Sequence, residues 1–261
     1  MDKGSMSQNN AKYSVRSLEK ALDLLEYLES VGTPLGVRHI ESETGMPKST
    51  AQRLLEVLER RGYVKKQAGR YSLWIGAVPL SRSFLKGDIL VRASDEILRS
   101  LTDLSSETTS LYVRQGFDRI LIHRVESPHP LRFSTPIGER LPLHLGASGQ
   151  ALCTGMSDTE LMEYFSKVEP VRLAGGTELN RFELLQRVQN VRTCGYAVGV
   201  AERYKEVTSV AAPVITPTEG VIAAINIVGP TSRMDSVNME RLLIEIRGAA
   251  AELSVRVSAG F

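Results

Sequence analysis

The segment at residues 36–55 constrains the fold more than any other, because two short amphipathic stretches meet there at a glycine. The first stretch ends at Thr44, and Gly45 follows with a backbone freedom that residues carrying a Cβ lack. Pro47 suits the first turn of a second helix, where its missing N–H has no partner to lose. Two crossed helices would bury the apolar side chains of this segment: Ile40, Met46, Ala51, Leu54 and Leu55. The segment therefore predicts a helix-turn-helix.

The second helix of this pair has a polar face that is typical of DNA-binding helices. Its apolar side chains repeat at helical spacing on the other face: Ala51, Leu54, Leu55 and Leu58. The polar face would carry Ser49, Arg53 and Arg60, flanked by Thr50 and Gln52. In the major groove of DNA, Arg commonly contacts guanine and Gln commonly contacts adenine. Taken alone, the pattern also fits a solvated amphipathic helix of any small helical domain.

The flanking sequence favours the DNA interpretation. Apolar residues repeat at helical spacing before the pair, after an expected N-cap at Ser17: Leu18, Ala21, Leu22, Leu25 and Leu28. After Gly62, residues 63–67 and 70–73 indicate a hairpin that turns at Ala68 and Gly69. Residues 44–75 hold seven basic residues against two acids, although the formal net charge of the chain is only +2. The basic residues are Lys48, Arg53, Arg60, Arg61, Lys65, Lys66 and Arg70. This surplus suits a phosphate backbone, and the whole pattern predicts a winged helix-turn-helix.

Length and composition bound the remaining possibilities. A chain of 261 residues with 42% hydrophobic and 24% charged residues suits a soluble protein of two domains. The longest apolar run, residues 221–228, is too short to span a bilayer, and no signal-peptide pattern opens the chain. Cys153 and Cys194 form no disulfide framework, so we expect a cytoplasmic protein. We expect residues 1–12 to form a disordered leader, in which residues 1–5 precede a natural start at Met6.

The second half of the chain has the pattern of an α+β sensor domain. Expected helices cover residues 76–86, 88–107, 147–153, 158–165, 178–192 and 239–257. Expected strands cover residues 108–114, 119–125, 131–134, 196–200, 207–215 and 220–228. The last two strands are largely apolar and are joined by a short Thr-Pro-Thr-Glu-Gly turn, which predicts a buried hairpin.

Several segments resemble catalytic motifs but lack an essential part. Residues 146–150 resemble a nucleophile elbow around Ser148, but Gln150 stands where the last glycine is required. The histidines have no metal-ligand spacing: His39, His123, His129 and His144. Residues 175–176 lack the Lys and Ser/Thr of a phosphate loop, and Cys194 has little support for a redox role. We therefore expect no catalytic residue, no metal and no cofactor.

The loop at Gly146 allows a different role. It leads from an apolar segment into a helix that starts near Ala147, and the backbone N–H groups at that helix start could hold a carboxylate. A tight turn that is needed only for packing explains the same residues equally well.

Taken together, these motifs make the chain resemble the IclR family of bacterial transcription regulators over about residues 13–258. In the N-terminal part the resemblance rests on residues 17–22, 44–50, 53–55 and 58–63. In the sensor it rests on residues 141–144, 147–151, 195–197, 202, 210–214 and 229–230.

The resemblance implies a winged helix-turn-helix at residues 13–75, a linker helix at 76–93 and a GAF-like effector-binding domain at 94–258. It also implies dimers or dimers of dimers, palindromic or repeated operators, and control by small organic or aromatic acids. The effector pocket carried over by motif would include Gly146, Ala147, Ser209 and Asn226.

Three positions depart from the family pattern. Asn226 and Val228 stand where some acid-binding relatives have small hydroxyl residues, which changes the pocket size and suggests a less polar ligand. Glu41 takes a position that is usually small, so the helix pair would pack slightly apart there or Glu41 would point outward.

We therefore expect a ligand-responsive DNA-binding regulator, a repressor or an activator, of a metabolic operon of the catabolic kind. The residues expected to contact DNA are Pro47, Lys48, Ser49, Thr50, Gln52, Arg53, Lys65, Lys66 and Arg70. The main alternative is a metabolite-converting enzyme domain fused to a DNA-binding head. A pure oligomerisation protein is a further alternative.

Overall fold

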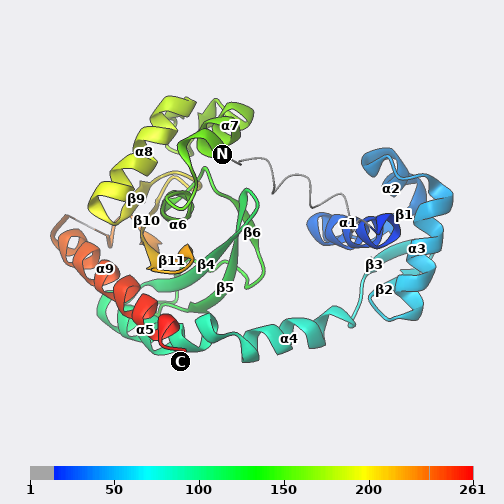
Figure 1. Ribbon diagram of the computed structural model, residues 1–261, viewed down its shortest axis with the longest axis horizontal. Helices are drawn as coiled ribbons and strands as arrows, with labels where there is room; N and C mark the ends of the chain where they lie inside the picture. Colours follow the sequence, from blue (N-terminus) through cyan, green and yellow to red (C-terminus); the bar gives the residue numbers. More distant parts are fainter. Residues whose placement is uncertain (1–14, 235, 261) are drawn as a thin grey trace, which may run out of the picture. The chain divides into compact units, whose positions relative to one another are not determined.

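The computed structural model describes residues 15–234 and 236–260, and the leader expected over residues 1–12 lies outside this part. The chain divides into two compact units, Met1–Phe84 and Leu85–Phe261 (Figure 1).

The N-terminal unit is a winged helix-turn-helix, as the sequence predicts. It contains α1 (Arg16–Val31), β1 (Leu35–Gly36), α2 (Val37–Thr44), α3 (Lys48–Arg60), β2 (Val64–Gln67) and β3 (Arg70–Leu73). The strands form an antiparallel sheet in the order β1-β3-β2. The apolar residues expected between the helices do build the core: Leu24, Leu28, Ile40, Met46, Ala51, Leu55 and Leu58 are buried.

The start of α1 differs from expectation. Ser17 is not its N-cap, because the helix begins at Arg16 and no side chain caps it. Leu18 and Leu22 also stay exposed, because the core contacts the face of α1 that carries Leu24 and Leu28.

The segment expected as a linker helix contains α4 (Ala77–Gly87) and the start of α5 (Ile89–Ser105). Asp88 separates the two helices with an extended backbone, and its Oδ1 accepts a hydrogen bond from the Val91 N–H at 3.0 Å. This carboxylate satisfies one of the backbone donors that a helix start leaves without a partner.

The second unit is built on a six-stranded antiparallel sheet in the order β6-β5-β4-β11-β10-β9. Its strands are β4 (Thr108–Gln115), β5 (Asp118–Val125), β6 (Arg140–Pro142), β9 (Ala197–Val200), β10 (Val207–Thr216) and β11 (Gly220–Pro230). The expected hairpin is present, because β10 pairs with β11 along its whole length.

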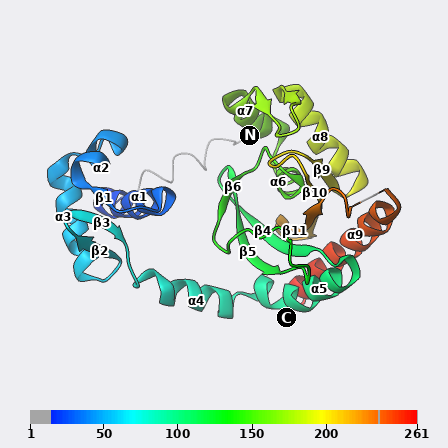
Figure 2. The same cartoon turned by 180° about the vertical axis from the view of Figure 1, so that it is seen from behind.

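Helices cover both faces of this sheet (Figures 1 and 2), so its central strands are buried on both sides. On one face, α9 (Ser236–Ser258) packs on β10, which carries Val210, Ala212 and Val214, and α5 packs on β4, β5 and β11. On the other face, α6 (Ala147–Cys153), α7 (Asp158–Val168) and α8 (Arg181–Cys194) pack around Ala211 and Ala224. Because successive strand residues alternate between faces, the register fixes which side chains lie beneath α6.

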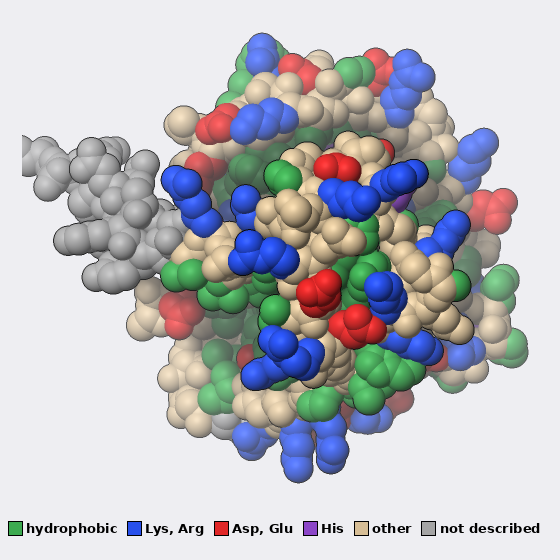
Figure 3. All heavy atoms as spheres, turned by 90° about the vertical axis from the view of Figure 1, so that its right-hand side faces the viewer, with side chains coloured by type: hydrophobic (Ala, Val, Ile, Leu, Met, Phe, Trp, Pro, Cys, Tyr) green, Lys and Arg blue, Asp and Glu red, His purple; other side chains and the backbone are tan. Residues whose placement is uncertain are grey.

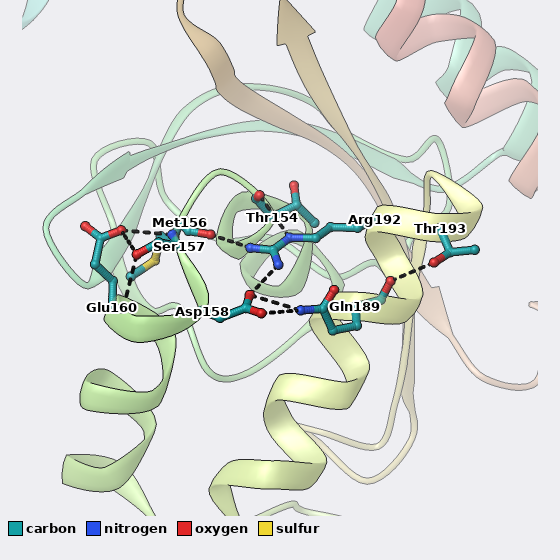
Figure 4. A network of polar contacts seen from close by, with 8 residues as sticks. All are labelled: Thr154, Met156, Ser157, Asp158, Glu160, Gln189, Arg192 and Thr193. Atoms are coloured by element: carbon teal, nitrogen blue, oxygen red, sulfur yellow. Dashed lines mark hydrogen bonds and ion pairs between the residues drawn. The ribbon is translucent and has the colours of Figure 1, made fainter.

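A network of polar contacts holds α7 against α8 on this second face (Figure 4). Arg192 of α8 pairs with Asp158 at 2.5 Å, and the Gln189 amide donates to both oxygens of the same carboxylate at 2.9 Å. Arg192 also donates to the carbonyls of Thr154 and Met156. The contacts join the start of α7 to the end of α8.

Two sequence expectations in this unit are wrong. Residues 131–134 form no strand; instead the Phe133 carbonyl accepts a hydrogen bond from the Thr108 hydroxyl, so side chains hold this segment as a loop. The helix expected at 178–192 begins later, because Glu178–Leu179 form β8, which pairs with β7 (Val171–Arg172). Asn180 then caps α8 through a capping box with Glu183.

Candidate functional site

The turn before α3 presents that helix through backbone and side-chain hydrogen bonds. Gly45 adopts a φ of +68°, and Pro47 lies at the N-cap of α3 and not inside its first turn. The Glu41 carboxylate accepts a hydrogen bond from the Lys48 N–H at 2.9 Å. Glu41 therefore reaches from α2 to the N-terminus of α3 and compensates the positive end of the α3 dipole. The sequence marked Glu41 only as a large side chain at a usually small position and did not indicate this role.

The N-terminal half of α3 presents polar side chains to solvent. Lys48, Ser49, Gln52 and Arg53 are exposed, and Thr50 is half-buried. Within the part of the chain that the structure describes, no side-chain hydrogen bond or ion pair involves Ser49, Gln52 or Arg53. Their donors and acceptors are therefore available to a partner surface such as base edges.

The β2–β3 hairpin carries three of the predicted cations. It turns at Ala68 and Gly69, both with positive φ. The Lys65 Nζ lies 4.4 Å from the centre of the Trp74 ring, and the Lys66 Nζ lies 5.4 Å from that of Tyr71. The hydrogen bond and charge interaction with Tyr71 raise the pKa of Lys66, so Lys66 stays charged. Arg70 is exposed as well. Figure 3 shows basic side chains standing out more often than acidic ones on the face it draws.

A pocket lies beneath the N-terminus of α6 on the second unit. The four residues predicted for the effector site all line it: Gly146, Ala147, Ser209 and Asn226. Sequence reasoning missed most of its remaining lining: Tyr112, Arg119, Phe133, Ser148, Gly199, Glu202, Arg203, Tyr204 and Val207. Val228, which the sequence flagged as a departure, also lines it.

The strand register explains why Ser209 and Asn226 meet there. Ser209 pairs with Val228 across β10 and β11, and Asn226 pairs with Ala211. All four side chains therefore lie on the α6 face of the sheet. The Ser209 hydroxyl is 3.4 Å from the Ala147 N–H, a long hydrogen bond that leaves this donor weakly satisfied.

The helix N-terminus is partly occupied by the protein's own carboxylate. Glu202 is buried; its Oε2 accepts a hydrogen bond from the Gly146 N–H at 2.6 Å, and its Oε1 accepts one from the Gln150 amide at 2.9 Å. Arg187 forms an ion pair with the same carboxylate. The sequence placed free N–H groups at this helix start, but the Gly146 N–H is already bonded. In the sequence, only the family resemblance singled out Glu202, and that resemblance named no hydrogen-bond partner for its carboxylate.

Arg119 is the second buried charge of the pocket. Its guanidinium donates to the carbonyls of Pro142, at 2.5 Å, and Leu145. The guanidinium carbon lies 5.6 Å from the centre of the Tyr112 ring. Burial lowers the pKa of Arg119 to about 10, which still leaves the side chain charged at neutral pH.

The residues considered for catalysis are not assembled into a nucleophile and base. Ser148 is buried in α6, and His144 hydrogen-bonds to the Tyr164 hydroxyl at 2.8 Å. Burial raises the pKa of the Cys153 thiol to about 12. Among the described residues, no group of three or more His, Cys, Asp or Glu side chains is placed to hold a metal, and no helix could cross a membrane.

Comparisons with known proteins agree with this architecture. The family model for the bacterial transcriptional regulator IclR C-terminal domain matches residues 83–255, and the model for the IclR helix-turn-helix domain matches residues 17–68. The chain is 30% identical to the HTH-type transcriptional repressor AllR of Klebsiella pneumoniae over 227 residues, which covers 86% of this chain and 84% of that protein. It is 29% identical to AllR of Escherichia coli K12 over 226 residues, with coverage of 86% and 83%.

Solved structures share the fold over nearly the whole chain. An IclR transcriptional regulator from Alicyclobacillus acidocaldarius superposes with a TM-score of 0.81 at 22% identity, covering 94% of this chain and 99% of that one. An IclR homolog from Microbacterium hydrocarbonoxydans, complexed with 4-hydroxybenzoate, gives a TM-score of 0.74 at 22% identity, with coverage of 93% and 99%.

Proposed function

The chain belongs to the IclR family of bacterial transcriptional regulators, and from that premise we propose that a small organic or aromatic acid controls its binding to operator DNA. Its relatives are named transcriptional repressors and regulators, so the chain is a regulator and not an enzyme. The observation that carries the proposal is the pocket beneath α6, in a chain whose helix α3 also presents Ser49, Gln52 and Arg53 to solvent.

We propose that α3 reads the bases and that the hairpin holds the DNA backbone. Ser49, Gln52 and Arg53 would contact base edges, with Pro47 and Thr50 beside them at the helix start. The cations Lys48, Lys65, Lys66 and Arg70 would contact phosphates or the minor groove. Phosphate contacts fix the register of a protein on DNA, whereas base contacts select the sequence.

We propose that the effector binds against Gly146, Ala147, Ser209 and Asn226. Polar groups from two strands and a helix start converge there on a pocket that also has aromatic walls, which suits a small acid with an apolar body. The Microbacterium homolog of the same fold holds 4-hydroxybenzoate, a molecule of this class. In the cytoplasm, the acid would control transcription of an operon whose products metabolise it or a related compound.

We propose that the active species is a homodimer or a dimer of dimers. Among the described residues α4 has no buried side chain, and it exposes Val78, Leu80 and Phe84. Leu18 and Leu22 of α1 are exposed too. Apolar faces of this kind mark sites of association, and a second copy is the partner that pairs two recognition helices on a repeated operator.

The test is binding of the purified protein to the intergenic DNA upstream of its own gene. Affinity is measured over a salt series, against random duplex of the same length, with and without a panel of organic and aromatic acids. We expect tight, salt-dependent binding that at least one acid shifts. Asn226→Leu, which removes the amide at similar volume, should lose the acid response and keep the DNA affinity. Binding equal to that for random DNA and insensitive to every acid would contradict the proposal.

A further inference from the structure

Arg119 is a buried cation that, among the described residues, no carboxylate contacts directly, while the charge of Glu202 acts on it through space. It lies on β5 and shares the α6 face of the sheet with Leu121, and its exposed fraction is only 3%. Within the described residues its recorded hydrogen bonds go from Nη1 to two backbone carbonyls, and no carboxylate pairs with it. Its Nε is buried with no hydrogen-bond partner. A charge buried in this way is costly unless a counter-charge reaches it.

The surrounding backbone leaves room for the guanidinium. A Cβ at Gly149 would lie 2.7 Å from Arg119 Nη1, and a Cβ at Gly146 would lie 3.0 Å from Nη2. Any side chain at these two positions would therefore crowd the group. The glycines keep Arg119 directly beneath the pocket floor at the start of α6, where Nη2 has no recorded partner among the described residues.

Two cations, Arg119 and Arg203, line the pocket against one carboxylate, Glu202. Glu202, a carboxylate that lines the pocket, is already bound by Gly146, Gln150 and Arg187. Arg203 lines the pocket as a second cation. Arg119 is the deeper of the two, because Arg203 is only half-buried.

We propose that Arg119 is the residue that selects an anionic effector: the ligand's carboxylate approaches Arg119 beside the Ala147 N–H and supplies the direct counter-charge that Glu202, which acts on Arg119 only through space, does not. This inference rests on the proposed function, because it names the group that recognises the acid. The ligand class is then a monoanionic carboxylate, and an uncharged amide of the same shape binds less well. Charge-assisted hydrogen bonds of this kind correspond to a preference of about 10- to 100-fold.

The experiment is isothermal titration of the full chain with matched acid and amide pairs: benzoate and benzamide, 4-hydroxybenzoate and its amide, pyruvate and pyruvamide. Arg119→Met removes the charge and keeps an unbranched stem, whereas Arg119→Lys keeps the charge. Arg192→Met is the matched control, because Arg192 also donates to backbone carbonyls but has its own carboxylate (Figure 4). Arg192 does not line the pocket.

We expect the wild-type chain to favour at least one acid over its amide by tenfold or more. Arg119→Met should remove that preference, Arg119→Lys should keep part of it, and Arg192→Met should leave it unchanged. If Arg119→Met does not fold, an equal affinity of the wild-type chain for every acid that it binds and for the matching amide overturns the inference. An unchanged preference in Arg119→Met overturns it too, while the proposed function stands. A wild-type chain that binds no member of the panel contradicts both.

Discussion

Glu202 supports the start of α6, so its removal should destabilise the second unit strongly. The side chain is 3% exposed and accepts hydrogen bonds from the Gly146 N–H and the Gln150 amide besides its ion pair with Arg187. In Glu202→Ala, Arg187 would keep its charge with a side chain that is only 24% exposed. The two remaining donors would lose their acceptor in a buried site.

The magnitude follows from those losses. Breaking a buried ion pair by deleting one partner costs about 3–5 kcal/mol, because the surviving charge is left uncompensated. For a unit of this size each kcal/mol shifts the melting temperature by about 2–4 °C, which gives a fall of roughly 10 °C. Arg187→Ala should cost less, about 1–2 kcal/mol, since Glu202 keeps its other two donors.

Differential scanning calorimetry of the full chain measures this effect, because it can separate the transitions of two units. The double variant should cost less than the sum of the single ones by 1 kcal/mol or more. Glu178→Ala is the control: its pair with Arg172 is exposed on both sides, so the loss should stay near or below about 0.5 kcal/mol. A melting temperature of Glu202→Ala within 2 °C of wild type, where roughly 10 °C is expected, would refute the reasoning.

Four further predictions concern DNA binding, the packing of α6 and the two cysteines. Arg53→Ala should cost about 1–3 kcal/mol of operator binding and relax one base preference, whereas Lys66→Ala should weaken binding to all sequences and reduce the salt slope by about one; fluorescence anisotropy over a salt series measures both. Gly149→Ala should strongly lower the melting temperature of the second unit in a thermal scan, because its Cβ would lie 2.2 Å from the carbonyl oxygen of Leu143. The raised pKa of Cys153, about 12, leaves almost no thiolate at pH 8, so a thiol reagent should label the half-buried Cys194 first and Cys153 only on unfolding; equal labelling rates would contradict this.

The sequence predicts most of the fold because the deciding signals are local. Gly45 between two apolar stripes is enough for the helix-turn-helix, and the turn at residues 216–220 is enough for the β10–β11 hairpin. The predictions fail where contacts with residues distant in the sequence determine the local structure. Residues 131–134 have strand-like composition, but their carbonyls bond to side chains such as Thr108 and not to a neighbouring strand.

The residues of the candidate pocket also divide into those that a local sequence pattern predicts and those that only long-range contacts determine. Ser209 and Asn226 lie on strands whose alternation and register are readable, so their approach to α6 follows from local pattern. Glu202 reaches a backbone N–H that is 56 residues away, and no periodicity encodes such a contact. Arg119 did leave a signal, because alternation along β5 places it on the same face as the buried Leu121. A cation on an apolar strand face must find a counter-charge or remain costly, and that energetic imbalance is the basis of the proposed contact between Arg119 and an anionic ligand.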